Sequence, residues 1–133
     1  MAESTDKVLQ VELVAADRTV WSGRAEMVIA RTVEGDVGVL RGHAPMLALL
    51  TDAVVEITDD EGNVTVAVVD GGFLSVAGDR VSVLSERAVL SEEISVDEVR
   101  AELDTARDLG GVDESERRIR RAEARLRAVE RAS

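Results

Sequence analysis

The chain contains no cysteine and no tyrosine, and its 133 residues include one tryptophan, one phenylalanine and one histidine. Without cysteine, disulfides, thiolate catalysis and cysteine-bound metal are excluded. The single histidine, His43, has no nucleophile motif to accompany it, so we expect neither a catalytic residue nor a metal site. His43 is interpreted instead as a turn residue or a partner contact. The composition therefore predicts a non-catalytic protein.

Long apolar runs are also missing. No stretch of about 20 apolar residues is available to span a bilayer, and residues 1–7 lack the apolar run of a signal peptide. We therefore expect a soluble protein in a reducing compartment, with no direct membrane insertion. The formal net charge of −11 argues against nucleic-acid binding. Residues 113–133 differ, because their seven arginines outnumber five acidic residues and favour an acidic protein partner.

Residues 8–90 consist of short runs in which apolar and polar residues alternate, the pattern of strands with one exposed face. Residues 59–63 are interpreted as a hairpin loop in which Gly62 takes a positive φ. Seven or more short strands at this spacing predict a β-sandwich or barrel. The predicted strands cover residues 9–13, 25–31, 37–40, 53–58, 64–69, 73–76 and 81–84.

The period changes to that of helices after residue 90. Ser95 and Glu98 form the signature of a capping box, which predicts a helix to about residue 108. Gly110-Gly111 is expected to end this helix, and Asp113 to cap a second one. In the second helix, apolar residues at spacings of three and four form one narrow stripe: Ile119, Ala122, Leu126 and Val129.

These patterns divide the chain into a mainly β domain, residues 1–91, and a C-terminal α-helical hairpin, residues 92–133. Two helices joined by so short a turn are expected to pack antiparallel. The apolar stripe is thin, so we expect the hairpin to be the less stable part and able to detach from the β domain. The remaining open interpretation is a free-standing β-sandwich binding module. The chain lacks the signal peptide and surface aromatics typical of such modules.

The middle of the chain carries the segment Gly35-Asp36-Val37-Gly38-Val39-Leu40-Arg41-Gly42-His43-Ala44-Pro45. Its glycines are followed by neither the lysine nor the helix of a phosphate loop, so they are interpreted as tight turns. The segment is similar to the characteristic loop of the epsilon subunit of rotary, F-type ATP synthases. Residues 70–76 and 81–88 resemble two further segments of this family, in the same order.

The resemblance implies an N-terminal antiparallel β-sandwich of about ten strands, followed by an antiparallel two-helix hairpin. It also implies a non-catalytic central-stalk subunit of the proton-translocating ATP synthase, peripheral to the cytoplasmic face of the membrane. Such a subunit couples rotation of the c-ring and gamma subunit to ATP synthesis. Asp36, Val37, Gly38 and His43 fall where the family meets gamma and the c-ring.

The hairpin of the family is regulatory, since it can extend toward the catalytic alpha and beta subunits and restrain ATP hydrolysis. The resemblance implies that Arg117, Arg118, Arg121 and Arg125 contact acidic residues there. A mainly structural subunit, whose hairpin stays docked, is the alternative within the same family.

Some members of the family bind ATP through an Ile/Leu-Asp-x-x-Arg-Ala motif. Val96, Asp97, Arg100 and Ala101 match it with valine at the first position, and Arg107 falls where a further arginine occurs. The resemblance thus implies ATP as a regulatory ligand, while no cofactor is required. Against this, the first helix is shorter than in long-hairpin members, and Asp97 also suits the positive end of any helix.

Overall fold

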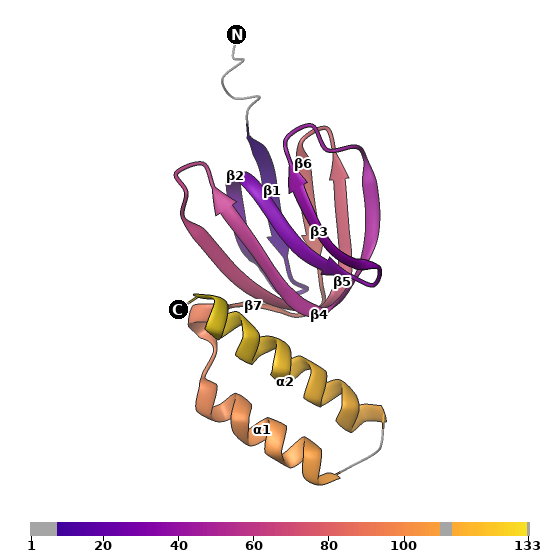
Figure 1. Cartoon of the computed structure of the whole chain (residues 1–133), viewed down its shortest axis with the longest axis vertical. Coiled ribbons are helices and arrows are strands. Elements are labelled where there is room, and N and C mark those ends of the chain that lie inside the picture. Colours follow the sequence, from indigo (N-terminus) through magenta and orange to yellow (C-terminus); the bar gives the residue numbers. More distant parts are fainter. Residues whose placement is uncertain (1–7, 110–112, 133) are drawn as a thin grey trace.

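The computed structural model describes residues 8–109 and 113–132, so the predicted Gly110-Gly111 helix stop lies outside the described residues. A curled β-sheet occupies one end of the molecule and a helical hairpin the other, with α2 between the sheet and α1 (Figure 1). The strands are β1 (Leu9–Val14), β2 (Thr19–Thr32), β3 (Gly35–Leu40), β4 (Met46–Asp59), β5 (Val64–Ala77), β6 (Arg80–Leu84) and β7 (Ala88–Leu90). A short 3-10 turn, η2 (Ser91–Glu93), leads to α1 (Val96–Leu109) and α2 (Asp113–Ala132). The predicted mainly β fold with a C-terminal helical hairpin is confirmed.

The sheet closes on itself. Its strands follow the order β1-β6-β5-β4-β2-β3, with β7 on β5, and β1 also pairs with β2. All pairings are antiparallel except that of β1 with β6, so the predicted antiparallel sandwich is confirmed and contains one parallel pair. The reason is geometric, because β1, β2, β4, β5 and β6 form a ring of five strands. Directions cannot alternate completely around an odd ring, so one neighbouring pair must be parallel.

The strand count differs from the expected ten because three strands are long. β2, β4 and β5 each have 14 residues, and different parts of them meet different neighbours. β5, for example, pairs with β7 over Ala67–Val69 and with β6 over Phe73–Ala77. Between these parts, Gly71 and Gly72 have φ values of 76° and 117°, which bend the strand without ending it. If the two parts of each long strand are counted separately, the seven strands supply ten segments.

The core of the sheet is aliphatic, as a chain with so few aromatics requires. Its largest fully buried side chains include Leu9, Leu13, Ile57 and Leu74. In β1, buried and exposed positions alternate as predicted. Trp21 is only partly buried and packs against the edge of this core.

The hairpin uses two apolar faces of α2, where a single stripe is predicted. Toward α1, the partly buried Ile119 and Leu126 flank Ala122, which packs with Val99 and Leu103. Toward the sheet, Ala124 and Ala128 are fully buried against the outer side of β5, on Val66 and Val68. Alanine contributes little to an amphipathic pattern, so this second face is hard to recognise in the sequence.

Candidate functional site

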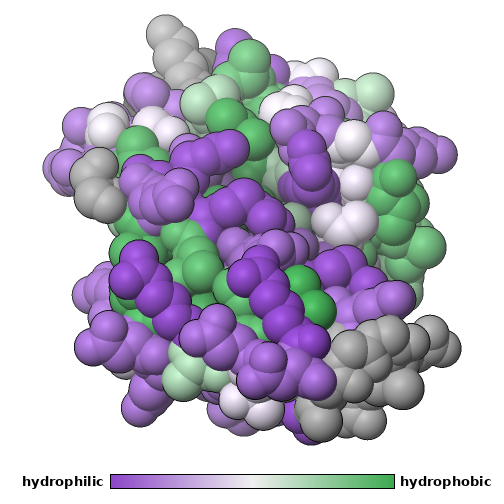
Figure 2. All heavy atoms as spheres, turned by 60° about the horizontal axis from the view of Figure 1, so that its bottom comes forward, coloured by the Kyte–Doolittle hydropathy of each residue, from purple (hydrophilic) through white to green (hydrophobic). Residues whose placement is uncertain are grey.

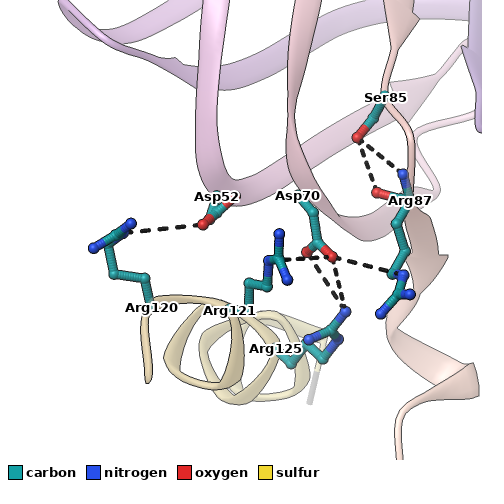
Figure 3. Close-up of polar contacts among 7 residues, drawn as sticks. All are labelled: Asp52, Asp70, Ser85, Arg87, Arg120, Arg121 and Arg125. Carbon is teal, nitrogen blue, oxygen red and sulfur yellow. Dashed lines mark hydrogen bonds and ion pairs between the residues drawn. The ribbon is translucent and has the colours of Figure 1, made fainter. Parts of the chain in front are cut away.

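Asp70 is the centre of the polar interface between the sheet and α2 (Figure 3). It lies in β5 beside the Gly71-Gly72 bend, and its side chain is only 5% exposed. Its carboxylate accepts hydrogen bonds from Nη2 of Arg125 at 3.3 and 3.5 Å. Nε of Arg121 lies 3.7 Å and Nε of Arg87 3.9 Å from Oδ2 of Asp70. One buried carboxylate thus faces three guanidinium groups, two of them from α2.

A second carboxylate stands directly opposite the first. Asp52 of β4 is the cross-strand partner of Asp70, and Nε of Arg120 lies 4.0 Å from its Oδ2. Farther along α2, Arg131 pairs with Glu56 of β4. Like charges directly opposite each other destabilise a sheet. The arginines of α2 therefore compensate an acidic surface on β4 and β5.

The Gly71-Gly72 bend that carries Asp70 is sterically determined. A Cβ atom on Gly72 would lie 2.0 Å from the backbone oxygen of Leu84 and 2.9 Å from Cα of Ser85. The backbone of β5 therefore approaches the end of β6 more closely than any other residue permits. The backbone N–H of Asp70 also donates to the carbonyl of Arg87 at 3.0 Å.

An uncovered apolar row crosses the outer side of the sheet beyond this bend. Leu49, Phe73 and Leu84 are direct neighbours across β4, β5 and β6, and each is about half exposed. Leu47, two residues before Leu49 on β4, is 73% exposed. We call these four residues the apolar row. By contrast, hydrophilic side chains cover much of the hairpin end, with apolar groups between them (Figure 2).

The loop of residues 41–45, which follows β3, is hydrogen-bonded to the turn between β5 and β6. The backbone N–H of Gly42 donates to Oδ1 of Asp79 at 2.7 Å. Nδ1 of His43 lies 2.7 Å from the carbonyl of Ala44, and the ring is half-buried. The loop thus has a defined conformation at one end of the sheet.

Comparisons with known proteins agree with this architecture. The family model described as "ATP synthase, Delta/Epsilon chain, beta-sandwich domain" matches residues 8–91. Over 121 residues the chain is 48% identical to the ATP synthase epsilon chain of Streptomyces griseus, covering 91% of this chain and 94% of the relative. The chain belongs to the epsilon chains of ATP synthase. It is 46% identical to the epsilon chain of Rhodococcus jostii, covering 99% of this chain and all of the relative.

Two solved structures share the fold of this epsilon-family chain. One, from the Euglena gracilis mitochondrial ATP synthase, matches with a TM-score of 0.73 and 24% identity, covering 93% of this chain and 78% of the other. The second, from the Tetrahymena thermophila mitochondrial ATP synthase, matches with a TM-score of 0.64 and 16% identity, covering 91% and 96%. The predicted family, and with it the non-catalytic subunit, is confirmed.

Of the four residues expected to meet gamma and the c-ring, three lie within β3 and the fourth, His43, lies apart from them in the loop that follows. Asp36, Val37 and Gly38 lie in β3, where Asp36 accepts from Nε of Arg31 at 3.1 Å, whereas His43 follows the strand. Four residues of extended strand, about 13 Å, separate Asp36 from the end of β3. Gly38 is a strand residue, which corrects its interpretation as a turn glycine.

The four arginines that were predicted to be regulatory also divide into two pairs in this epsilon-family chain. Arg121 and Arg125 face the sheet and pair with Asp70. Arg117 and Arg118 lie on the exposed part of α2. Their type and helical period are evident in the sequence, but which of them face the sheet depends on how α2 is docked.

An open cavity of about 570 Å³ lies between the two helices and the turn that joins β6 to β7. Of the five residues expected to bind ATP, only Ala101 lines it; Val96, Asp97, Arg100 and Arg107 do not. Arg107 pairs instead with Glu123 at 3.4 Å. The cavity is cationic, since its lining is Arg87, Ala101, Glu102, Thr105, Arg118, Arg121 and Arg125.

In the described parts of the chain, no helix has the length and apolarity needed to cross a membrane. Within residues 8–109 and 113–132, no group of three or more acidic or histidine side chains is arranged to hold a metal ion.

Proposed function

We propose that the chain is a central-stalk subunit of the proton-translocating ATP synthase, seated on the gamma subunit and the c-ring. In this role it transmits rotation between proton flow and ATP synthesis, at the cytoplasmic face of the membrane. The apolar row is the observation that supports this proposal. A soluble monomer gains nothing from a contiguous row of exposed leucines and a phenylalanine, whereas a partner subunit would bury it.

Binding to the cognate gamma subunit tests this function. The intact chain should form a stable complex on a sizing column at micromolar concentration. A variant with Leu49→Ser and Phe73→Ser should bind at least about tenfold more weakly, because central apolar contacts dominate interface energies. Val64→Ser is the matched control, since Val64 is 55% exposed but lies at the other end of β5.

The two possible failures have different meanings. If the intact, folded chain forms no complex with gamma, the coupling role loses its main support. If the complex forms but the double variant binds as tightly as the control, the apolar row is not the gamma-binding surface.

Contact with the c-ring is proposed for the loop of residues 41–45, together with Asp36, Val37 and Gly38 of β3. The loop is anchored by Asp79, so His43 would be presented with little ordering cost on binding. His43→Ala should weaken assembly on a purified c-ring–gamma complex without changing the melting temperature. Unchanged assembly would remove His43 from the interface.

Restraint of ATP hydrolysis is proposed for the exposed arginines of α2 in an extended hairpin. Arg121 and Arg125 reach an acidic partner only after they leave Asp70, whereas Arg117 and Arg118 are exposed while the hairpin is docked. Substituting Arg117 and Arg118 by glutamine should raise hydrolysis in a reconstituted complex that the intact chain inhibits. Unchanged hydrolysis would contradict the proposed contact.

ATP is proposed as a regulatory ligand of the arginine-lined cavity. Arg118, Arg121 and Arg125 offer the bidentate groups that bind phosphates well, and Ala101 of the family motif lies in the same lining. Millimolar ATP should raise the melting temperature of the intact chain and raise it less for Arg118→Gln. Arg24→Gln, which alters an exposed arginine paired with Asp60, is the control. No shift in the intact chain would exclude this ligand.

A further inference from the structure

Among the described residues, α2 makes the main contact of the hairpin with the sheet. α1 packs chiefly on α2, and α2 in turn lies on β4 and β5. The buried apolar part of this attachment consists of small side chains, Ala124 and Ala128 on Val66 and Val68. An alanine buries much less apolar area than a leucine, so this contact alone holds the hairpin weakly.

The polar part of the attachment converges on Asp70. Its carboxylate is almost fully buried and pairs with both Arg121 and Arg125 of α2. Nε of Arg121 is buried and has no hydrogen-bond partner, so its compensation is the charge of Asp70 at 3.7 Å. Removing that charge would leave two partly buried arginines, whose side chains are 30% and 14% exposed, beside each other without their counter-ion, which is unfavourable. The guanidinium groups become fully hydrated when α2 leaves the sheet.

Repulsion between two carboxylates of the sheet also raises the free energy of the undocked state. Once α2 departs, Asp52 and Asp70 face each other across β4 and β5 without Arg120, Arg121 and Arg125, and Arg87, at 3.9 Å, stays beside Asp70. The close approach of Gly72 to the end of β6 holds the backbone next to Asp70, so Asp70 stays opposite Asp52 in the sheet. Docking of α2 therefore relieves a like-charge contact that is built into the sheet.

We propose that Asp70 is the latch of the hairpin: its charge decides whether α1 and α2 stay docked on an otherwise unchanged β domain. The latch goes beyond the stalk function proposed above, because it is a property of the isolated chain and needs no partner subunit. It also supplies the step that frees Arg121 and Arg125 for any other acidic surface.

Hydrogen exchange of the full-length Asp70→Asn variant tests the latch. We expect amides of α1 and α2 to exchange on the order of 100-fold faster than in the parent chain, while amides of β1, β2, β4 and β6 keep their protection. Glu123→Gln is the control, because it removes the Arg107–Glu123 pair within the hairpin and leaves the contacts of Asp70 in place. Exchange in the control should stay within about threefold of the parent.

A second variant distinguishes loss of the contacts with α2 from a local effect of the Asp70→Asn substitution on β5. Arg121→Gln combined with Arg125→Gln leaves the sheet sequence intact and should release the hairpin to a similar extent. Adding Asp70→Asn to this pair should then produce little further change in hairpin exchange, since the three substitutions break the same contacts with α2, and the Arg87–Asp70 pair that Asp70→Asn also removes lies outside the hairpin. The proposal is overturned if either variant leaves hairpin exchange unchanged. It is also overturned if Asp70→Asn accelerates exchange equally in strands and helices, because Asp70 would then stabilise the whole fold.

Discussion

Replacing Gly72 by alanine should destabilise the protein more than the same change at any other described glycine. At φ 117° an L-residue is strained, which costs about 1–3 kcal/mol. The added Cβ would also stand 2.0 Å from the backbone oxygen of Leu84. Since this neighbour is backbone rather than a flexible side chain, β6 itself must move, at a further cost of about 1–3 kcal/mol. We therefore expect a loss of about 2–6 kcal/mol.

Two other glycines separate these causes. Gly62 has φ 88°, but a Cβ added to it would have no other atom within 4 Å, so Gly62→Ala should show the strain alone, about 1 kcal/mol. Gly38 lies within β3 at an ordinary φ and also has open space around it. Gly38→Ala should be neutral or stabilising by up to about 1 kcal/mol, because alanine restricts the unfolded chain.

Urea denaturation measures the series, with the fluorescence of Trp21 and circular dichroism as independent probes of unfolding. Equal slopes m among the variants would show that the midpoint shifts report stability. The reasoning is refuted if Gly72→Ala costs no more than Gly62→Ala, because the close approach to Leu84 would then be unimportant. Hydrogen exchange of Gly72→Ala should also show a less protected hairpin, since the bend positions Asp70.

Three further results are expected. The pKa of Asp59 lies below its ordinary 3.8 because the backbone N–H groups of Asn63 and Glu61 donate to its carboxylate. The contribution of Asp59 to stability is therefore complete above pH 3.8 and is lost as pH falls through the lowered pKa, a loss that Asp59→Asn should not show. An ordinary pKa of Asp59 in an NMR titration would contradict this account. The pKa of Glu93 is likewise lowered, first by the side-chain hydrogen bonds of Arg18 at 2.6 and 3.0 Å, so Arg18→Gln should raise it, and an unchanged titration would contradict that cause. Leu74→Ala should lower the free energy of unfolding, measured by thermal denaturation, by about 2–5 kcal/mol because Leu74 is fully buried. A loss of stability smaller than that of Leu47→Ala, which alters an exposed leucine, would be inconsistent with the place of Leu74 in the core.

Local patterns of the sequence determined the elements and much of their extent. The alternation in residues 9–13 and 81–84 depends only on neighbours along the chain, and both runs are strands. The predicted first helix, ending near residue 108, agrees with α1, and the hydroxyl of Ser95 accepts from the N–H of Glu98 at 3.3 Å. Residues 64–69 and 73–76 were predicted as two strands, because Gly71-Gly72 is a turn signal. In the structure they form one bent strand, since the partners on β4 continue past the bend.

Pairing between distant residues was decided by the tertiary structure. The sequence shows an arginine-rich helix and an acidic β domain, but Asp70 and Arg125 are 55 residues apart and no local pattern joins them. Leu49, Phe73 and Leu84 become one surface only through the register of three strands.

What the sequence by itself determined, then, is the succession of strands and helices along the chain, an aliphatic core and the family. Those features depend on residue type and on spacing along the chain, which a sequence states directly. The docking of α2, the burial of Asp70 and the position of the apolar row required the tertiary structure. They depend on distances between segments that fold next to each other, and a linear pattern does not contain those distances.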